Sequence, residues 1–142
     1  MYARQMLAGW GDTDFNGHMR NTAYLDKSAD LRMLYFAEHG FAAAEFARLR
    51  IGPVILRDEI EYFREIDMLS PIQVTLAAAG LSIDGSRFKV RNEFFRPDGK
   101  LAARVTSLGG WLDLAARQMI APPAELRSAF GGMPRTEDFS QF

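Results

Sequence analysis

The chain of 142 residues has the length of one domain, and a chain of this length buries about 70% of its unfolded surface without a metal or disulfide to hold it. Its 17 basic and 18 acidic residues give a formal charge of −1, which argues against a nucleic-acid-binding protein. The absence of cysteine excludes disulfides, zinc–thiolate sites, iron–sulfur clusters and a cysteine nucleophile. No apolar run reaches the about 20 residues of a membrane span, and the first residues lack the apolar core of a signal peptide. We therefore expect a cytoplasmic protein that does not contact membranes.

The first half of the sequence predicts four segments, which in chain order are a strand over residues 2–9, a polar loop over 10–20, a long helix over 21–38 and a short helix over 41–49. The loop is dense in Gly, Asp and Asn, which favour turns. Apolar residues spaced by three, four and seven positions predict the long helix. Asn21 is a favourable N-cap, and Gly40 is well placed to end the helix.

After Gly52-Pro53 the apolar pattern changes to the alternation of strands. The second half predicts strands over residues 54–63, 72–79, 86–95 and 101–114, followed by a short helix over 124–130. Gly109-Gly110 indicates a bulge in the last of these strands. Residues 131–142 carry a glycine pair, a proline and few apolar residues, so we expect a frayed, flexible tail at the end of a single domain over residues 1–142.

The order of these elements predicts an α+β fold. Consecutive strands joined by short turns pair in the antiparallel sense. One antiparallel sheet and one long helix bury their apolar surfaces best against each other. A curved sheet wrapped around a central helix satisfies this pattern.

The densest group of polar residues immediately precedes the long helix and comprises Asp12, Asp14, Asn16, His18 and Asn21. The first N–H groups of a helix have no internal partner, so they can hold a carbonyl oxygen as it becomes an oxyanion. A carboxylate in this loop could act as a general base or a nucleophile, and Gly17 would let a substrate approach the backbone closely. The same residue types are common in turns and caps, so the pattern alone leaves both interpretations open.

The stretch WGDTDFNGHMRNTAYL, residues 10–25, resembles the opening motif of hotdog-fold thioesterases. It is similar to the 4-hydroxybenzoyl-CoA thioesterase branch, whose pattern is Asp-x-Asp-x-x-Gly-His-x-x-Asn-x-x-Tyr, and the similarity continues over about residues 2–127. The resemblance implies a five-stranded antiparallel sheet around a long central helix. It also implies a homodimer or homotetramer in which sheets join edge to edge and active sites lie at the subunit interface. The implied activity is hydrolysis of an acyl-CoA thioester to a free acid and CoA, without a metal or organic cofactor.

The resemblance also implies roles for individual residues. In the 4-hydroxybenzoyl-CoA branch the second Asp of the motif is the catalytic carboxylate, which corresponds to Asp14, and a backbone N–H near residues 17–21 would polarise the carbonyl. The chain departs from that branch by having Phe15-Asn16 in place of Pro-Ala. Plant acyl-carrier-protein thioesterases have a similar Asp-x-Asn-x-His motif, which implies roles for Asn16 and His18. We therefore take Asp14 as base or nucleophile, with Asn16 and His18 as further catalytic candidates.

The candidate substrate-binding residues are Gly17, Asn21, Tyr24, Asp30, Arg87 and Arg91. Tyr24 could line an acyl pocket or pack in the core. Asp30 corresponds to an acid of the plant enzymes, whereas Lys27 and Arg32 indicate that this helix also has a solvent-exposed side.

Arg87, Lys89 and Arg91 alternate along one strand face, where they could pair with the phosphates of CoA together with Arg57 and Arg64. A solvated outer face of the sheet is the alternative interpretation of this row.

Three other functions remain open alongside the acyl-CoA thioesterase. The chain could bind acyl-CoA without hydrolysing it, or could hydrolyse acyl groups carried by an acyl carrier protein. A hotdog dehydratase or hydratase is a third possibility, although those enzymes use a catalytic His and an acid at other spacings. The sequence does not indicate the acyl group.

Overall fold

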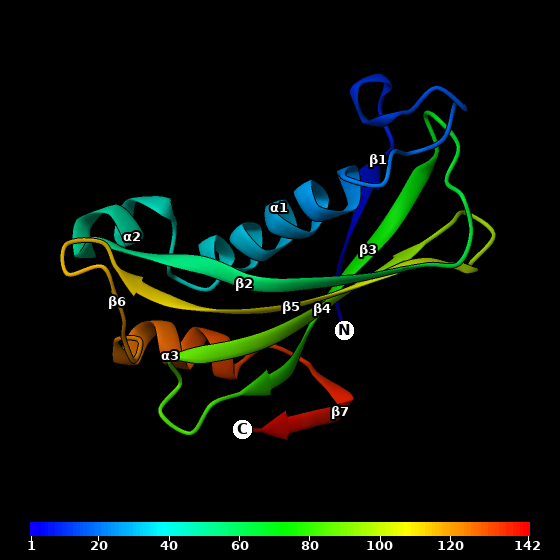
Figure 1. Cartoon of the computed structure of the whole chain (residues 1–142). Helices are drawn as coiled ribbons and strands as arrows, with labels where there is room; N and C mark the ends of the chain where they lie inside the picture. The colour runs from blue at the N-terminus through cyan, green and yellow to red at the C-terminus, as the bar shows by residue number, and fades with distance from the viewer.

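The computed structural model describes all 142 residues and contains a single curled sheet with helices packed against it (Figure 1). Its elements are β1 (Tyr2–Leu7), the 3-10 helix η1 (Trp10–Asp12), α1 (Ala23–Glu38), α2 (Ala43–Leu49), β2 (Ile51–Tyr62), β3 (Pro71–Leu81), β4 (Arg87–Phe95), β5 (Leu101–Asp113), β6 (Gln118–Met119), α3 (Ala124–Gly131) and β7 (Arg135–Gln141). The main strands are ordered β1-β3-β4-β5-β2 and pair in the antiparallel sense. The predicted α+β fold, an antiparallel sheet of five main strands around a long helix, is confirmed.

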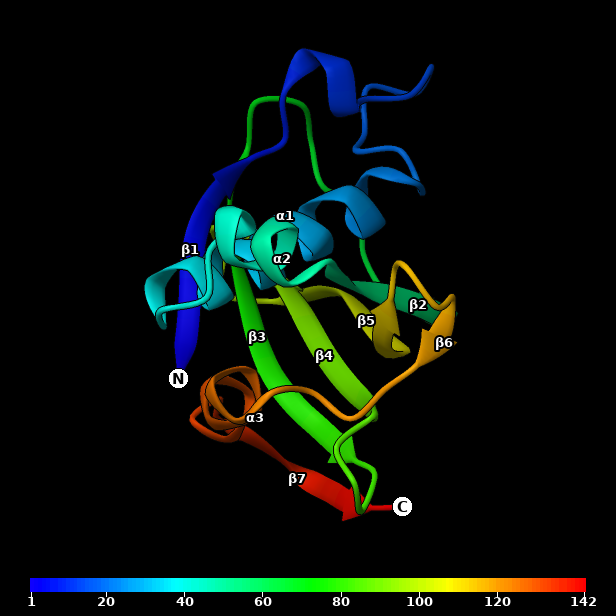
Figure 2. The ribbon, with the colours of Figure 1, turned by 90° about the vertical axis from the view of Figure 1, so that its left-hand side faces the viewer.

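Helix α1 lies against the concave face of the sheet, as Figure 2 shows from the end of the helix. Its buried residues recur every three or four positions, which gives the helix one buried and mostly apolar side. Beneath it, the inward side chains of β4 and β5 form an aromatic core around Trp111. The Trp111 ring centroid is 5.6 Å from that of Phe36 in α1 and 5.0 Å from that of Phe88 in β4.

The ends of α1 differ partly from the prediction. The helix begins at Ala23, and Thr22 occupies the N-cap position without a side-chain capping bond, so the prediction of Asn21 as the N-cap is wrong. The predicted end is confirmed, because Gly40 follows the last turn with φ +82°, a conformation that glycine adopts without strain.

The predicted bulge lies in a different strand. The pairs Ile55↔Gly109 and Arg57↔Leu108 leave Leu56 of β2 as the extra residue, so the bulge beside Gly109 is in β2. The irregularity in β5 lies at Ala102, between the pairs Phe94↔Ala103 and Phe95↔Leu101, and not at Gly109-Gly110. Gly109 is required for another reason: a Cβ at this position would lie 2.5 Å from the carbonyl oxygen of Val54.

The prediction of a frayed tail is wrong. Residues 135–141 form β7, which pairs in parallel with the end of β3 through Ala78↔Arg135 and Gly80↔Ser140. The Arg91 guanidinium also binds the Asp138 carboxylate at both of its oxygens, with N–O distances of 2.9 and 3.1 Å. The strand was missed because its partner is more than fifty residues earlier in the chain, whereas its own composition is that of a loop.

The attachment of β7 is expected to weaken in acid. Arg91 holds the pKa of the Asp138 carboxyl at about 2, below its ordinary value of 3.8. A lowered folded-state pKa stabilises the fold above the ordinary value, and that stabilisation is lost as the pH falls from about 4 towards 2. We expect Asp138→Asn to lower the amide-exchange protection of β7 at pH 7, relative to that of β4. The variant Asp98→Asn, which removes another exposed arginine pair, serves as control. Equal β7 protection in wild type and Asp138→Asn would contradict the prediction.

Candidate active site

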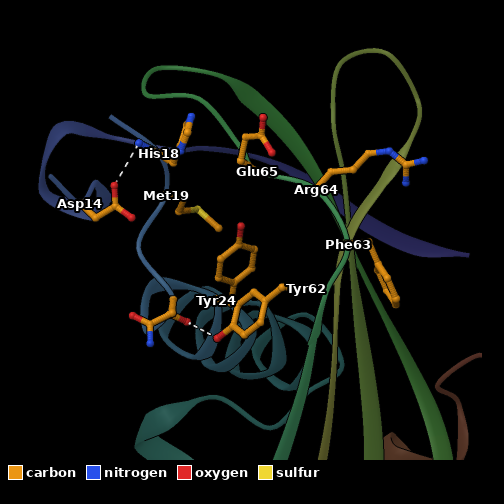
Figure 3. A pocket seen from close by; sticks show the side chains of 9 residues that line it. Asp14, His18, Met19, Tyr24, Tyr62, Phe63, Arg64 and Glu65 are labelled. Carbon is orange, nitrogen blue, oxygen red and sulfur yellow. Dashed lines mark hydrogen bonds between the residues drawn. The ribbon is translucent and has the colours of Figure 1, made fainter. Parts of the chain in front are cut away.

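A pocket of about 350 Å³ opens where the loop before α1 meets the segment after β2 (Figure 3). Its lining residues come from the loop, the first turn of α1, and the end of β2 with the residues that follow it: Asp14, His18, Met19, Asn21, Tyr24, Tyr62, Phe63, Arg64 and Glu65. The predicted residues Asp14, His18, Asn21 and Tyr24 are therefore brought together in one pocket.

Backbone hydrogen bonds hold the loop in place. The Asp14 N–H donates to the His18 carbonyl at 2.8 Å, and the turn between them passes through Gly17 with φ +76°. The Met19 N–H donates to the Ile66 carbonyl at 2.7 Å, which fastens the loop to the segment after β2. Gly17 therefore serves the turn geometry and is not among the residues that line the pocket.

The Asp14 carboxylate is oriented through one of its two oxygens. Oδ1 accepts hydrogen bonds from the backbone N–H groups of Asn16, at 2.8 Å, and His18, at 3.3 Å. Oδ2 has no hydrogen-bond partner in the chain. This arrangement fixes the carboxylate at the pocket while leaving one oxygen free to meet a water molecule or a substrate.

The two other catalytic candidates are placed differently. The His18 side chain lines the pocket, and its Nε2 lies 3.6 Å from Oδ1 of Asp67. The Asn16 side chain is exposed and does not line the pocket, so its contribution there is the backbone N–H that binds Asp14.

Unpaired N–H groups are available at the start of α1. The backbone N–H groups of Asn21, Thr22 and Tyr24 have no acceptor in the chain, and no side chain caps the helix. The Asn21 carbonyl accepts a hydrogen bond from the Tyr62 hydroxyl at 2.9 Å, which joins the helix start to the end of β2. The missing cap leaves donors where the positive end of the helix dipole favours a developing negative charge.

The Tyr24 ring forms the inner wall of the pocket. It is 2% exposed and packs edge-on against the rings of Tyr62 and Phe94, with centroid distances of 5.4 and 5.1 Å. Figure 3 shows its hydroxyl pointing towards the space between the Asp14 loop and Glu65. Burial, assisted by Tyr62 and by the charges of Asp14 and Glu65, raises the pKa of Tyr24 to about 12, so the hydroxyl remains a hydrogen-bond donor at neutral pH.

Most of the far wall of this pocket lies outside the residues predicted from the sequence. Tyr62 and Phe63, the last two residues of the predicted strand over 54–63, and Glu65 just after it were not identified as site residues. Arg64 was considered for phosphate binding, and it is the one arginine that lines the pocket; its Nη1 donates to the Leu101 carbonyl at 3.0 Å.

The structure does not bring the remaining substrate-binding candidates to the pocket. Asp30 is exposed on α1 and lies outside the pocket lining. Arg87 and Arg91 belong to the face of β4 that points away from α1, because the intervening residues Phe88 and Val90 are buried beneath the helix. Arg91 is already bound to Asp138.

Two further features bear on what the chain can bind. No three or more His, Asp or Glu side chains lie together in a way that could hold a metal ion. No helix combines the length and apolar character needed to cross a bilayer.

Comparison with protein families gives a match over residues 8–130 to the model of the thioesterase-like superfamily. The chain belongs to the thioesterase-like superfamily. The match covers the loop, α1 and the four main strands β2 to β5, and it begins just after β1, so the pocket lies entirely within the matched part of the chain. No curated protein matches the chain.

Solved structures with the same fold include proteins named as thioesterases. A Staphylococcus aureus protein solved with CoA is 19% identical, with a TM-score of 0.82 over 95% of this chain and 87% of that one. A 1,4-dihydroxy-2-naphthoyl-CoA thioesterase from Synechocystis is 14% identical, with a TM-score of 0.82 over 92% and 96%. A DHNA-CoA thioesterase from Staphylococcus aureus is 17% identical, with a TM-score of 0.83 over 92% and 88%. These similarities show that the chain has the hotdog fold of this thioesterase-like superfamily.

Proposed function

We propose that this protein is an acyl-CoA thioesterase. The observation that carries the proposal is that one pocket is lined by Asp14, which has a carboxylate oxygen without a partner, and by Asn21 and Tyr24, whose backbone N–H groups are unpaired. Membership of the thioesterase-like superfamily and the CoA thioesterases among its structural relatives support thioester hydrolysis.

In the proposed reaction, the thioester carbonyl oxygen accepts hydrogen bonds from the free N–H groups of Asn21 and Tyr24. Asp14 takes a proton from water, and the water oxygen forms a bond to the carbonyl carbon. The carbon–sulfur bond then breaks, and the proton held by Asp14 passes to the sulfur of CoA. In the alternative path, Asp14 attacks the carbon directly and water hydrolyses the resulting anhydride. Both paths yield a free acid and CoA, and both use the same unpaired donors.

Neighbouring side chains would assist this reaction. His18, next to Asp67, would position water or the thioester at the mouth of the pocket. Arg64 is the cation best placed to meet a phosphate of CoA, because it lines the pocket and its charge is not paired with a carboxylate.

We also propose that two copies of the chain join along β2. This strand is an edge of the sheet, and its backbone donors and acceptors on one side have no partner strand. Large apolar side chains are exposed on β2 and directly after it, namely Ile55, Leu56, Tyr62 and Phe63. Since Tyr62 and Phe63 also line the pocket, a second copy on this edge would lie beside the active site.

The test is release of free thiol from a panel of acyl-CoAs, from acetyl to palmitoyl and including benzoyl and phenylacetyl thioesters. We expect hydrolysis of at least one member of the panel, without added metal. Binding of acyl-CoA without thiol release would instead support a non-hydrolytic binding protein. If the protein hydrolyses acyl carrier protein thioesters, assayed in parallel, but none of the acyl-CoAs, its substrate is the acyl carrier protein thioester.

A further inference from the structure

Tyr24 is the one tyrosine of the chain whose hydroxyl has no partner. The hydroxyl groups of the other three tyrosines donate hydrogen bonds at 2.7 to 2.9 Å, namely Tyr2 to the Glu38 carboxylate, Tyr35 to the Ala129 carbonyl and Tyr62 to the Asn21 carbonyl. No atom of the chain accepts a hydrogen bond from the Tyr24 hydroxyl, although the residue is only 2% exposed. A buried tyrosine normally directs its hydroxyl to an acceptor, so this position calls for one from outside the chain.

The Tyr24 hydroxyl projects into the active-site pocket. Side chains of an α-helix lean towards its N-terminal end, so a tyrosine in the first turn extends over the start of the helix. Tyr24 is the second residue of α1, and Figure 3 shows its hydroxyl pointing into the space between Asp14, Met19 and Glu65. All four residues line the cavity of about 350 Å³. A molecule bound in this cavity can therefore reach the hydroxyl.

The position of the hydroxyl indicates which part of a thioester it meets. In the reaction proposed above, the thioester carbonyl oxygen lies on the N–H groups of Asn21 and Tyr24. The N–H and the hydroxyl of one tyrosine are separated by the length of its side chain, so a single oxygen cannot bind both. CoA is larger than the cavity and has to extend out of its mouth, which leaves the acyl group against the inner wall that Tyr24 forms. The hydroxyl therefore faces the acyl group.

The charges around the hydroxyl limit the chemistry of its acceptor. Burial, with the negative charges of Asp14 and Glu65, raises the pKa of Tyr24 to about 12, so the hydroxyl donates at neutral pH. A carboxylate on the acyl group would be repelled by Asp14 and Glu65. A hydrocarbon would displace water from the hydroxyl without replacing its hydrogen bond. A neutral hydroxyl on the acyl group can accept from Tyr24 and donate its own proton to Glu65.

We propose, on the basis of the thioesterase function above, that Tyr24 is a specificity-determining residue whose hydroxyl donates a hydrogen bond to a hydroxyl group at C3 of the acyl chain. An oxygen on C3 stands close to the thioester carbonyl along the chain. The carbonyl can therefore meet the N–H groups at the start of α1 while the C3 hydroxyl meets Tyr24. The substrate class is that of the 3-hydroxyacyl-CoA thioesters.

The test compares kcat/KM for butyryl-CoA and 3-hydroxybutyryl-CoA, and likewise for octanoyl-CoA and 3-hydroxyoctanoyl-CoA. In the wild type we expect the hydroxylated member of a pair to be preferred by about three- to tenfold, the range for one net hydrogen bond between neutral groups. Tyr24→Phe keeps the ring that packs against Tyr62 and Phe94, and should abolish this preference by lowering kcat/KM for the hydroxylated substrate alone. Tyr35→Phe removes the hydroxyl of another buried tyrosine of α1 outside the pocket, and should retain the preference.

Glu65→Gln provides a second and independent test. The wild type should discriminate against malonyl-CoA, which carries a carboxylate at C3, relative to 3-hydroxybutyryl-CoA. Removing the negative charge of Glu65 should raise kcat/KM for malonyl-CoA relative to 3-hydroxybutyryl-CoA. An unchanged ratio would contradict the placement of C3 beside Glu65, and this measurement keeps the inference testable if Tyr24→Phe does not fold.

The outcomes separate this inference from the proposed function. If the wild type hydrolyses no acyl-CoA, the thioesterase proposal fails, and calorimetric binding of the same pairs to the wild type and Tyr24→Phe then tests the recognition of the hydroxyl. Equal hydrolysis or binding of the hydroxylated and plain chains would overturn the inference, as would a preference that survives in Tyr24→Phe. A loss of the same size for both substrates in Tyr24→Phe would place the hydroxyl in a step common to them and overturn the inference as well.

Discussion

The variant Asp14→Asn is expected to lower kcat for thioester hydrolysis by about a hundredfold to ten-thousandfold, the usual contribution of a positioned acid–base group. Asparagine retains an oxygen that can accept the backbone N–H groups of Asn16 and His18, so the loop should keep its conformation. The amide nitrogen that replaces Oδ2 can neither take a proton from water nor attack the carbonyl carbon. Steady-state thiol release, with circular dichroism to verify folding, measures the effect.

A matched control is Asp26→Asn, which removes an exposed carboxylate from the first turn of α1 outside the pocket. Its kcat should equal that of the wild type. A normal kcat in Asp14→Asn would remove Asp14 from the mechanism. Single-turnover hydrolysis in oxygen-18 water detects an anhydride that water opens at the Asp14 carbonyl, because that path places the label in Asp14, whereas a general base places it only in the product acid.

The largest effect on stability is expected at Trp111. The chain has two tryptophans in opposite environments: Trp111 is completely buried, whereas Trp10 in η1 is 79% exposed. Trp111→Ala removes the ring that joins α1, α2 and β4, and should lower the free energy of unfolding by about 3–5 kcal/mol. Trp10→Ala should change it by no more than about 0.5 kcal/mol.

Urea denaturation followed by far-ultraviolet circular dichroism measures both variants. In addition, fluorescence of Trp10→Ala reports Trp111 alone, and its emission should shift to longer wavelength on unfolding as the ring enters water. Equal losses of stability in the two variants would mean that Trp111 is not the centre of the core.

Much of the fold could be predicted because its signals are local. The alternation of Phe88, Val90 and Phe94 with charged residues marks β4, and apolar residues three and four positions apart mark α1. The pairing of β7 with β3 depends on contacts between distant parts of the chain, so no short pattern in residues 135–141 reveals it. The N-cap of α1 was predicted at Asn21 and lies at Thr22, because the start of a helix depends on the geometry of the preceding loop, which residue type alone does not determine.

In the candidate site, too, the residues that are close in sequence could be predicted, whereas those from distant segments could not. Asp14, His18, Asn21 and Tyr24 are close in sequence and could be grouped from it, whereas Tyr62 reaches the pocket only through the length and direction of β2.

The exposure of two side chains of α1 was also predicted wrongly. Arg32 and Lys27 were interpreted as signs of a solvent-exposed side of α1. The structure instead buries Arg32 and pairs Lys27 with Asp12 at 2.9 Å, because the long apolar stem of a cationic side chain can pack against its neighbours.

The position of β7 has a consequence for how the protein behaves at high concentration. Without β7, the end of β3 around Ala78, Gly80 and Leu81 would be an uncharged strand edge with free backbone groups. Such an edge is a template on which other chains can add strands, and this is how open-ended aggregation begins. By covering this segment with its own last residues, several of them charged, the chain restricts sheet growth there. The attachment of β7 is therefore a safeguard against fibril formation as well as a part of the fold.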